Sequence, residues 1–184
     1  MRREYAHMQT ANNEEIGWYA LRVFHNKASQ VCAIADKEQV EWYTPIREHE
    51  EVVAGKVVLR KERLMPSLLF LRTTAEFIKR LKVNTANNIL PYTEPGTAKP
   101  MMIADEEMSK FIFVTRTAAR EAEPIDDSCL KPSERVRIVG GLFAGMEGYI
   151  TRVHGTKRFV ICIEGITAIA TTFIPKEYIQ RVTQ

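Results

Sequence analysis

The sequence lacks the residue clusters that build a metal site or a disulfide framework. Its three cysteines, Cys32, Cys129 and Cys162, lie far apart and form no CxxC or Cys/His ligand spacing. We therefore expect no metal site. The odd cysteine count and the lack of a secretory signal favour a protein of the reducing cytoplasm.

Long apolar runs are also absent. No stretch approaches the length that a membrane-spanning helix needs, so we expect no membrane partner. The first residues are polar and contain no apolar core, and we predict a short flexible leader over residues 1–16.

The sequence shows no catalytic constellation. Its histidines, His7, His25, His49 and His154, have no serine, cysteine or aspartate partner at an informative spacing. A phosphate-binding loop and a dinucleotide fingerprint are missing too. This pattern predicts a protein that works by binding, without a cofactor, and not an enzyme.

The composition is that of an ordinary folded protein. Of 184 residues, 45% are hydrophobic and 27% charged, which suits one medium domain or two small ones. The formal net charge of +3 permits contact with nucleic acid but does not require it.

In the N-terminal part, residue patterns alternate between strand and helix in the order β-α-β-β-β-α-β-α. Aromatic and β-branched runs predict strands, and Gly55 marks the tip of a hairpin. Apolar residues at helical spacing predict helices. The expected strands cover residues 18–24, 42–46, 64–73 and 89–92, the hairpin lies within residues 50–63, and the helices cover residues 27–39, 75–82 and 105–114. An α/β sandwich on a mixed or antiparallel sheet accommodates this order.

The composition changes after this part. Residues 117–128 are polar and acidic on balance, which is typical of an interdomain linker. A long loop within one domain is the alternative, although such loops are uncommon in compact domains. We predict an N-terminal domain over residues 17–115 and a linker over residues 116–130.

The remaining residues, 131–184, form a compact β pattern punctuated by glycines. Gly140, Gly141, Gly145 and Gly148 indicate tight turns and sharp backbone bends. The expected strands cover residues 136–139, 148–153, 158–163, 167–174 and 178–182. Five short strands in so few residues predict a small closed barrel.

Several segments resemble those of one family. Residues 136–150 resemble a KOW motif, in which a strand passes through a glycine-rich turn into the next strand of an SH3-like barrel. Ribosomal proteins use this motif too. Residues 18–23, 65–72, 89–90 and 100–107 resemble, in order, segments of the NusG N-terminal domain. The resemblance implies an α+β protein, with an N-terminal α/β sandwich joined by a linker to a small KOW barrel.

The segment around Pro66 departs from the usual pattern of that family. Ser67-Leu68 stands where the family has Gly-Tyr, and Leu64-Met65 stands where it has aromatic residues. These departures resemble the specialised RfaH and UpxY types, which are antiterminators for surface polysaccharide genes. The implied function is a transcription elongation or antitermination factor that suppresses pausing or termination in specific operons. A ribosome- or RNA-associated KOW protein is the alternative.

The resemblance also implies a polymerase-binding surface. An apolar groove would grip the clamp helices of RNA polymerase, since docking of a helix in a groove buries its apolar ridge. The candidates are Tyr19, Phe24, Leu64, Met65 and Leu68. The alternative is that these are ordinary core residues. The implied protein is a cytoplasmic monomer.

Two basic groups are candidates for contact with nucleic acid. Lys56, Arg60 and Lys61 lie on the hairpin, which in the family reaches the polymerase gate loop or nearby DNA. On a short helix, Lys79, Arg80 and Lys82 lie in the region that approaches the non-template DNA strand in the specialised paralogs. For both groups, a solvated charged surface is the alternative.

The KOW segment has its own candidate partner surface. Phe143, Met146 and Ile166 match positions at which the family contacts a ribosomal protein or a termination factor. Phe143 is also expected to pack inside the barrel.

Overall fold

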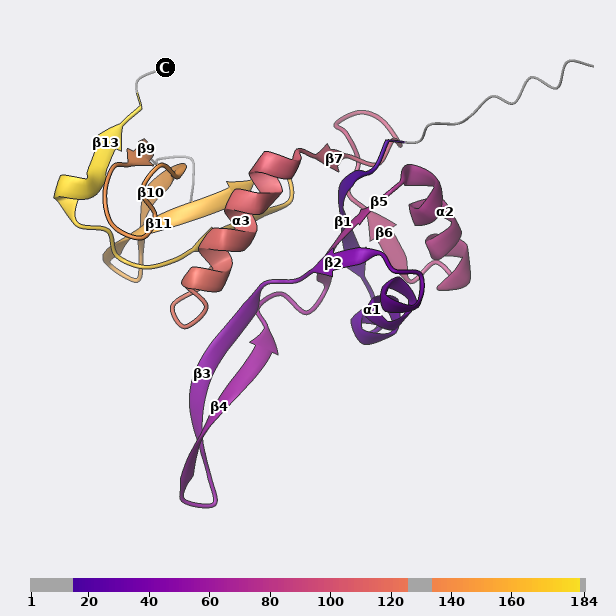
Figure 1. Cartoon of the computed structure of the whole chain (residues 1–184), viewed down its shortest axis with the longest axis horizontal. Helices are drawn as coiled ribbons and strands as arrows, with labels where there is room; N and C mark the ends of the chain where they lie inside the picture. Colours follow the sequence, from indigo (N-terminus) through magenta and orange to yellow (C-terminus); the bar gives the residue numbers. More distant parts are fainter. Residues whose placement is uncertain (1–14, 126–133, 183–184) are drawn as a thin grey trace, which may run out of the picture.

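The computed structural model describes residues 15–125 and 134–182 of the chain. Within these ranges the protein is a mixed α/β structure with three α-helices and open sheets (Figure 1). Cys129, most of the predicted leader and part of the predicted linker lie outside the described residues.

The N-terminal sheet is antiparallel and has β1 near its centre. Its strand order is β2-β5-β1-β6, and β7 also pairs with β1. The strands are β1 (Gly17–Val23), β2 (Glu41–Tyr43), β5 (Leu68–Thr73), β6 (Ile89–Pro91) and β7 (Met102–Ile103). The strand predicted over residues 64–73 begins only at Leu68, because the chain turns at Pro66-Ser67. The short strand β7 was not predicted.

The two faces of this sheet bury different residues of the same strands. In β1, Tyr19, Leu21 and Val23 pack in a cluster with helices α1 (Ala28–Lys37) and α2 (Ala75–Asn84). Trp18 and Ala20 belong to a separate cluster with helix α3 (Asp105–Thr117). Successive side chains on a strand point to opposite faces, so the nearly continuous apolar run in β1 reflects burial on both sides.

Helix α3 is fixed to the sheet by packing and by a buried polar contact. Met108, Phe111 and Val114 are fully buried. The Tyr43 hydroxyl lies 2.6 Å from Oγ1 of Thr115, which satisfies two buried polar groups at once. The helix runs to Thr117, slightly past its predicted end and into the predicted linker.

Strands β3 (Ile46–Val53) and β4 (Lys56–Arg63) form a separate two-stranded hairpin that extends away from the sheets (Figure 1). Ala54 and Gly55 at its tip have φ angles of 50° and 77°. Two successive positive φ values are typical of the type I′ turn, which matches the twist of an antiparallel pair. The predicted hairpin is therefore present, and it is longer than predicted at its N-terminal end.

The C-terminal sheet is antiparallel, with the strand order β13-β9-β10-β11-β12-β8. Its strands are β8 (Glu123–Ile125), β9 (Glu134–Ile138), β10 (Glu147–Val153), β11 (Thr156–Ile163), β12 (Thr167–Ala170) and β13 (Ile179–Arg181). Each predicted C-terminal strand has a counterpart here with shifted ends. The additional strand β8 comes from the predicted linker and pairs with β12.

Candidate functional site

Helix α3 lies between the N-terminal sheet and the C-terminal sheet (Figure 1). One apolar cluster runs through it without interruption, from Phe70 in the first sheet through Phe111 in the helix to Phe159 in the second. We call the contact between the C-terminal sheet and the N-terminal part, made by α3 and by Met65, the seam.

Specific side chains join the two parts at the seam. The rings of Phe113 in α3 and Phe143 after β9 meet edge to face, with centroids 6.3 Å apart. Phe143 in turn stacks on Phe159 at 6.1 Å. The Thr167 hydroxyl in β12 lies 3.2 Å from the sulfur atom of Met65. The seam is thus a packed aromatic and aliphatic interface.

Three of the five predicted polymerase-binding residues lie together at this cluster. Leu68 is buried within it, and Leu64 and Met65 are half-buried against it. The other two lie elsewhere. Tyr19 is 5% exposed in the cluster on the opposite face of the sheet, and Phe24 follows β1 and is 38% exposed. The five residues do not form one continuous surface.

The predicted partner residues of the KOW segment also lie at the cluster that forms the seam. Phe143 is buried in it, and Met146 and Ile166 are half-buried against it. Leu64, Met65 and Leu68 therefore share one cluster with all three predicted KOW partner residues.

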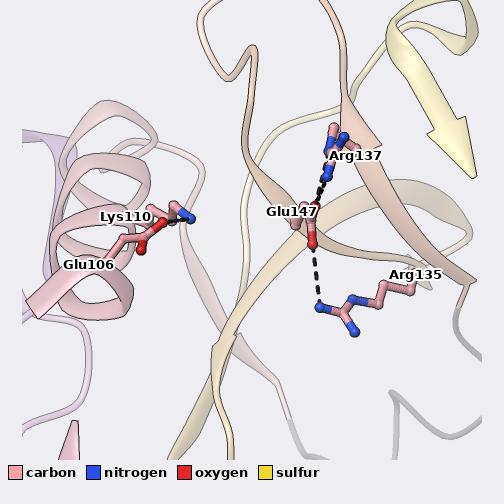
Figure 2. A network of polar contacts seen from close by, with 5 residues as sticks. All are labelled: Glu106, Lys110, Arg135, Arg137 and Glu147. Carbon is pink, nitrogen blue, oxygen red and sulfur yellow. Dashed lines mark hydrogen bonds and ion pairs between the residues drawn. The ribbon is translucent and has the colours of Figure 1, made fainter. Parts of the chain in front are cut away.

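Charged side chains lie at one side of the seam, on α3 and on the strands that face it. In Figure 2, Glu147 of β10 is held by Arg137 at 2.5 Å and by Arg135 at 3.3 Å. On α3, which faces β10, Lys110 pairs at 2.6 Å with Glu106 one turn earlier in the same helix. Hydrogen bonding from Arg137, with smaller contributions from nearby positive charges, lowers the pKa of the Glu147 carboxyl.

A cleft of about 660 Å³ opens between α3 and strands β10 and β11. Glu107 and Glu164 both line this cleft. Partial burial raises the pKa of Glu107, and the negative charge of Glu164 raises it further. The repulsion between these carboxylates opposes the apolar attraction across the seam.

The predicted basic group on the hairpin is mostly ion-paired. Arg60 contacts Glu51 at 2.7 Å and Lys61 contacts Glu48 at 2.7 Å. Lys56, beside the turn, is exposed. The part of the hairpin nearest the tip is apolar instead, with large exposed side chains at Val52, Val53, Val57, Val58 and Leu59.

The predicted basic group on α2 is also partly ion-paired. Lys79 lies 3.6 Å from Glu76, and Arg80 lies 3.4 Å from Glu38. The Arg80 guanidinium also lies over the ring of Phe77. These contacts reduce the positive charge that the helix presents to solvent.

The packing of α3 at the seam could have been anticipated from an apolar run in the sequence. Residues 111–114 are Phe-Ile-Phe-Val, and four successive apolar residues occupy all sides of a helix. Phe111 and Val114 of this run are fully buried, Ile112 is half-buried, and Phe113 is 44% exposed and contacts Phe143. Such a run indicates apolar contacts on more than one side of this turn, and here Phe111 meets Phe70 of the first sheet while Phe113 meets Phe143 of the second.

Within residues 15–125 and 134–182, no helix is both long and apolar enough to cross a bilayer. The same residues contain no group of three or more acidic, cysteine or histidine side chains placed to hold a metal ion.

A comparison with protein families identifies the N-terminal part. The family model described as transcription termination factor NusG matches residues 17–112, which is more than half of the chain. The match covers all of the N-terminal sheet and most of α3. Factors of this family act in transcription and interact with RNA polymerase, and they are not enzymes. The chain therefore belongs to the NusG family of transcription termination and antitermination factors.

Proposed function

We propose that this protein binds RNA polymerase during elongation and suppresses pausing or termination in a specific set of operons, as the RfaH and UpxY types do for surface polysaccharide genes. It acts as a cytoplasmic monomer that binds the elongating state of polymerase more tightly than the paused state. Only such a difference in affinity shifts the balance between the two states.

In this proposal the polymerase clamp helices bind at Leu64 and Met65. The supporting observation is that these two apolar side chains are half-buried against the α3 cluster, and that Met65 also contacts Thr167 of the C-terminal sheet. Leu68 beneath them is buried and supports their position. Because Thr167 of the C-terminal sheet touches Met65, binding requires this sheet to move away.

In this proposal the C-terminal sheet is a separable KOW domain with an SH3-like barrel fold. The C-terminal sheet moves away from the N-terminal part by rotation about residues 118–122, which connect α3 to β8. Once released, Phe143, Met146 and Ile166 become available to a ribosomal protein or a termination factor. The apolar cluster that the two parts share supports this exchange, since each part covers the other's candidate partner surface.

The two remaining surfaces fit secondary contacts in the complex. The exposed valines of the hairpin suit an apolar contact with polymerase, because clustered exposed apolar side chains mark interaction sites. In this proposal Lys56, at the hairpin tip, and Lys82, in α2, contact DNA phosphates, including those of the non-template strand.

A polymerase-binding assay tests the first step. We expect the double variant Leu64→Asp and Met65→Asp to weaken binding to purified polymerase by roughly tenfold or more, since charges disrupt an apolar contact. Val83→Asp is the matched control, because Val83 is 75% exposed on α2 at the opposite face of the sheet. Equal binding by the double variant and the control would contradict the proposed surface.

A transcription assay tests the outcome. Pause lifetimes should shorten and read-through should rise at saturating protein, and the double variant should lose both effects. Unchanged pausing with the unaltered protein would overturn the proposal. Recovery of ribosomes alone from a lysate would support a ribosome-associated KOW protein instead.

A further inference from the structure

A second cleft, of about 420 Å³, lies where the base of the hairpin meets the C-terminal sheet. Its walls come from three parts of the chain: Arg47 in β3, Arg120 after α3, and residues of the C-terminal sheet. A hydrogen bond of 3.0 Å from the Glu48 amide to the Ala119 carbonyl holds β3 against the connection after α3. The positions of the backbones that carry the two arginines are thus fixed relative to each other.

One wall of this cleft is held rigidly. The Arg158 guanidinium donates to a Glu123 carboxylate oxygen at 2.7 Å and to the backbone carbonyls of Thr171 and Glu121. The His154 imidazole lies 2.8 Å from the other Glu123 oxygen. The charge of Glu123 is therefore offset by partners within the wall.

The other two arginines of the cleft, Arg47 and Arg120, have no such partners among the described residues. Within residues 15–125 and 134–182, the side chains of Arg47 and Arg120 form no ion pair and no hydrogen bond. Three arginines line the cleft against two glutamates, Glu121 and Glu123. The ring of Phe173 is 56% exposed and lines the same cleft. Available guanidinium groups beside an exposed aromatic ring match the chemistry of a phosphate joined to a base.

We propose that this cleft binds a nucleoside phosphate, with the phosphate at Arg47 and Arg120 and the base against Phe173. Guanidinium groups bind phosphate oxygens through paired, charge-assisted hydrogen bonds. Aromatic side chains stack on any base. The volume lies within the range of small-molecule sites. The ligand is either a free nucleotide or one unit of a single-stranded RNA.

The site is complete only while the C-terminal sheet is docked, because Arg47 belongs to the N-terminal part and Phe173 follows β12. A ligand that contacts both parts binds the docked arrangement more tightly than the open one, and so favours it. This consequence rests on the proposed function: the ligand should weaken the protein's binding to polymerase. The binding site itself does not depend on that function.

Calorimetry with the full chain in the absence of polymerase tests the site. The probes are uridine monophosphate, uridine, inorganic phosphate and a short oligouridine. We expect uridine monophosphate to bind more tightly than uridine or phosphate. Arg47→Gln and Arg120→Gln should each weaken it by roughly tenfold, as expected for loss of a charged hydrogen bond. Phe173→Ala should remove the advantage of uridine monophosphate over inorganic phosphate.

Arg152→Gln is the matched control, since Arg152 is exposed in the same β10–β11 hairpin but does not line the cleft. It should bind as the unaltered chain does. Tighter binding of oligouridine identifies RNA as the ligand, and equal binding identifies a free nucleotide. No binding of any probe, equal binding of uridine and its monophosphate, or an equal loss in Arg152→Gln would overturn the proposal.

A failure of the site and a failure of the proposed function give different results. If only the site is wrong, polymerase binding persists and is insensitive to the ligand. If only the proposed function is wrong, calorimetry still detects the ligand while polymerase does not bind.

Discussion

The β3–β4 hairpin and the seam at α3 contain similar apolar side chains in opposite environments. On the hairpin, Val52 and Val57 are 71% and 66% exposed. At the seam, Phe111 and Phe143 are 0% and 3% exposed. The hairpin extends away from both sheets, whereas α3 has a sheet on each side (Figure 1).

The difference shows that residue type alone does not decide burial; the number of layers available to cover a segment does. A two-stranded hairpin has no second layer, so its apolar side chains stay exposed unless a partner covers them. Helix α3 acquires a second layer from a sheet that lies later in the sequence. The same residue types therefore stabilise the fold in one place and remain available for binding in the other.

The largest expected difference in stability comes from placing one charge in the hairpin and one in the buried cluster that continues through the seam. Leu68→Asp buries an unpaired carboxylate at a position that is 5% exposed, and should lower the free energy of unfolding by about 4 kcal/mol or more. Val57→Asp should change it by only about 0.5–1 kcal/mol, because the site is solvated. Urea denaturation measures both. Similar losses in the two variants would mean that the hairpin is covered in solution.

A smaller difference in stability is expected between alanine substitutions at two glycines, one in the C-terminal sheet and one in the hairpin. A Cβ atom at Gly148 in β10 would meet the Val160 carbonyl oxygen and, at 2.6 Å, the ring of Phe159. Gly148→Ala should therefore destabilise the protein by about 2–3 kcal/mol. Gly55→Ala at the hairpin tip meets no atom within 4 Å and strains only its φ of +77°, at about 1 kcal/mol. Thermal melting of the two variants distinguishes overcrowding from backbone strain, and the opposite ranking would contradict the close packing at Gly148.

The smallest expected change in stability comes from the charge of Glu107 at the seam. The raised pKa of Glu107 means that the docked protein holds this proton more tightly than an open or unfolded chain does. The protonated form of Glu107 therefore stabilises the docked protein relative to the ionised form. This stabilisation is present below the usual carboxyl pKa of about 4.3 and is lost as pH rises through the raised pKa.

Glu107→Gln should accordingly raise the melting temperature slightly at neutral pH and flatten its dependence on pH above about 4.3. Solvent screening keeps the gain small, because Glu107 remains exposed. Glu177→Gln, an exposed carboxylate in the 3₁₀ helix Lys176–Tyr178, is the control and should leave the melting temperature unchanged. A lower melting temperature in Glu107→Gln would show that its charge stabilises the seam.

Local patterns in the sequence were enough to predict most of the elements. The nearly continuous apolar run in β1 and the helical spacing of Met108 and Phe111 both reflect burial against neighbouring layers, which leaves a local signal in the sequence. The glycine-punctuated segment likewise predicted the strands of the C-terminal sheet. The division into domains and the closure of a barrel stay predictions.

Long-range pairing left much weaker signals. Strand β8 contains Glu123 and Pro124, which are rare inside sheets, and it forms only because β12 offers it an edge. The ion pairs of Arg60 and Lys61 depend on cross-strand register, so a count of positive charges overestimated what the hairpin presents. The arginine cleft joins Arg47 to Arg158 across more than half of the chain, beyond the reach of any local pattern.

The connection between α3 and β8 has a consequence for how any partner must compete. Only residues 118–122 separate Thr117 from Glu123, and a fully extended chain covers about 3.5 Å per residue. While β8 stays in its sheet, this tether keeps the C-terminal sheet within roughly 20 Å of the end of α3. The local concentration of the sheet is then on the order of millimolar and does not change on dilution. A partner must therefore outcompete the tethered sheet or separate β8 from β12, which would lengthen the tether.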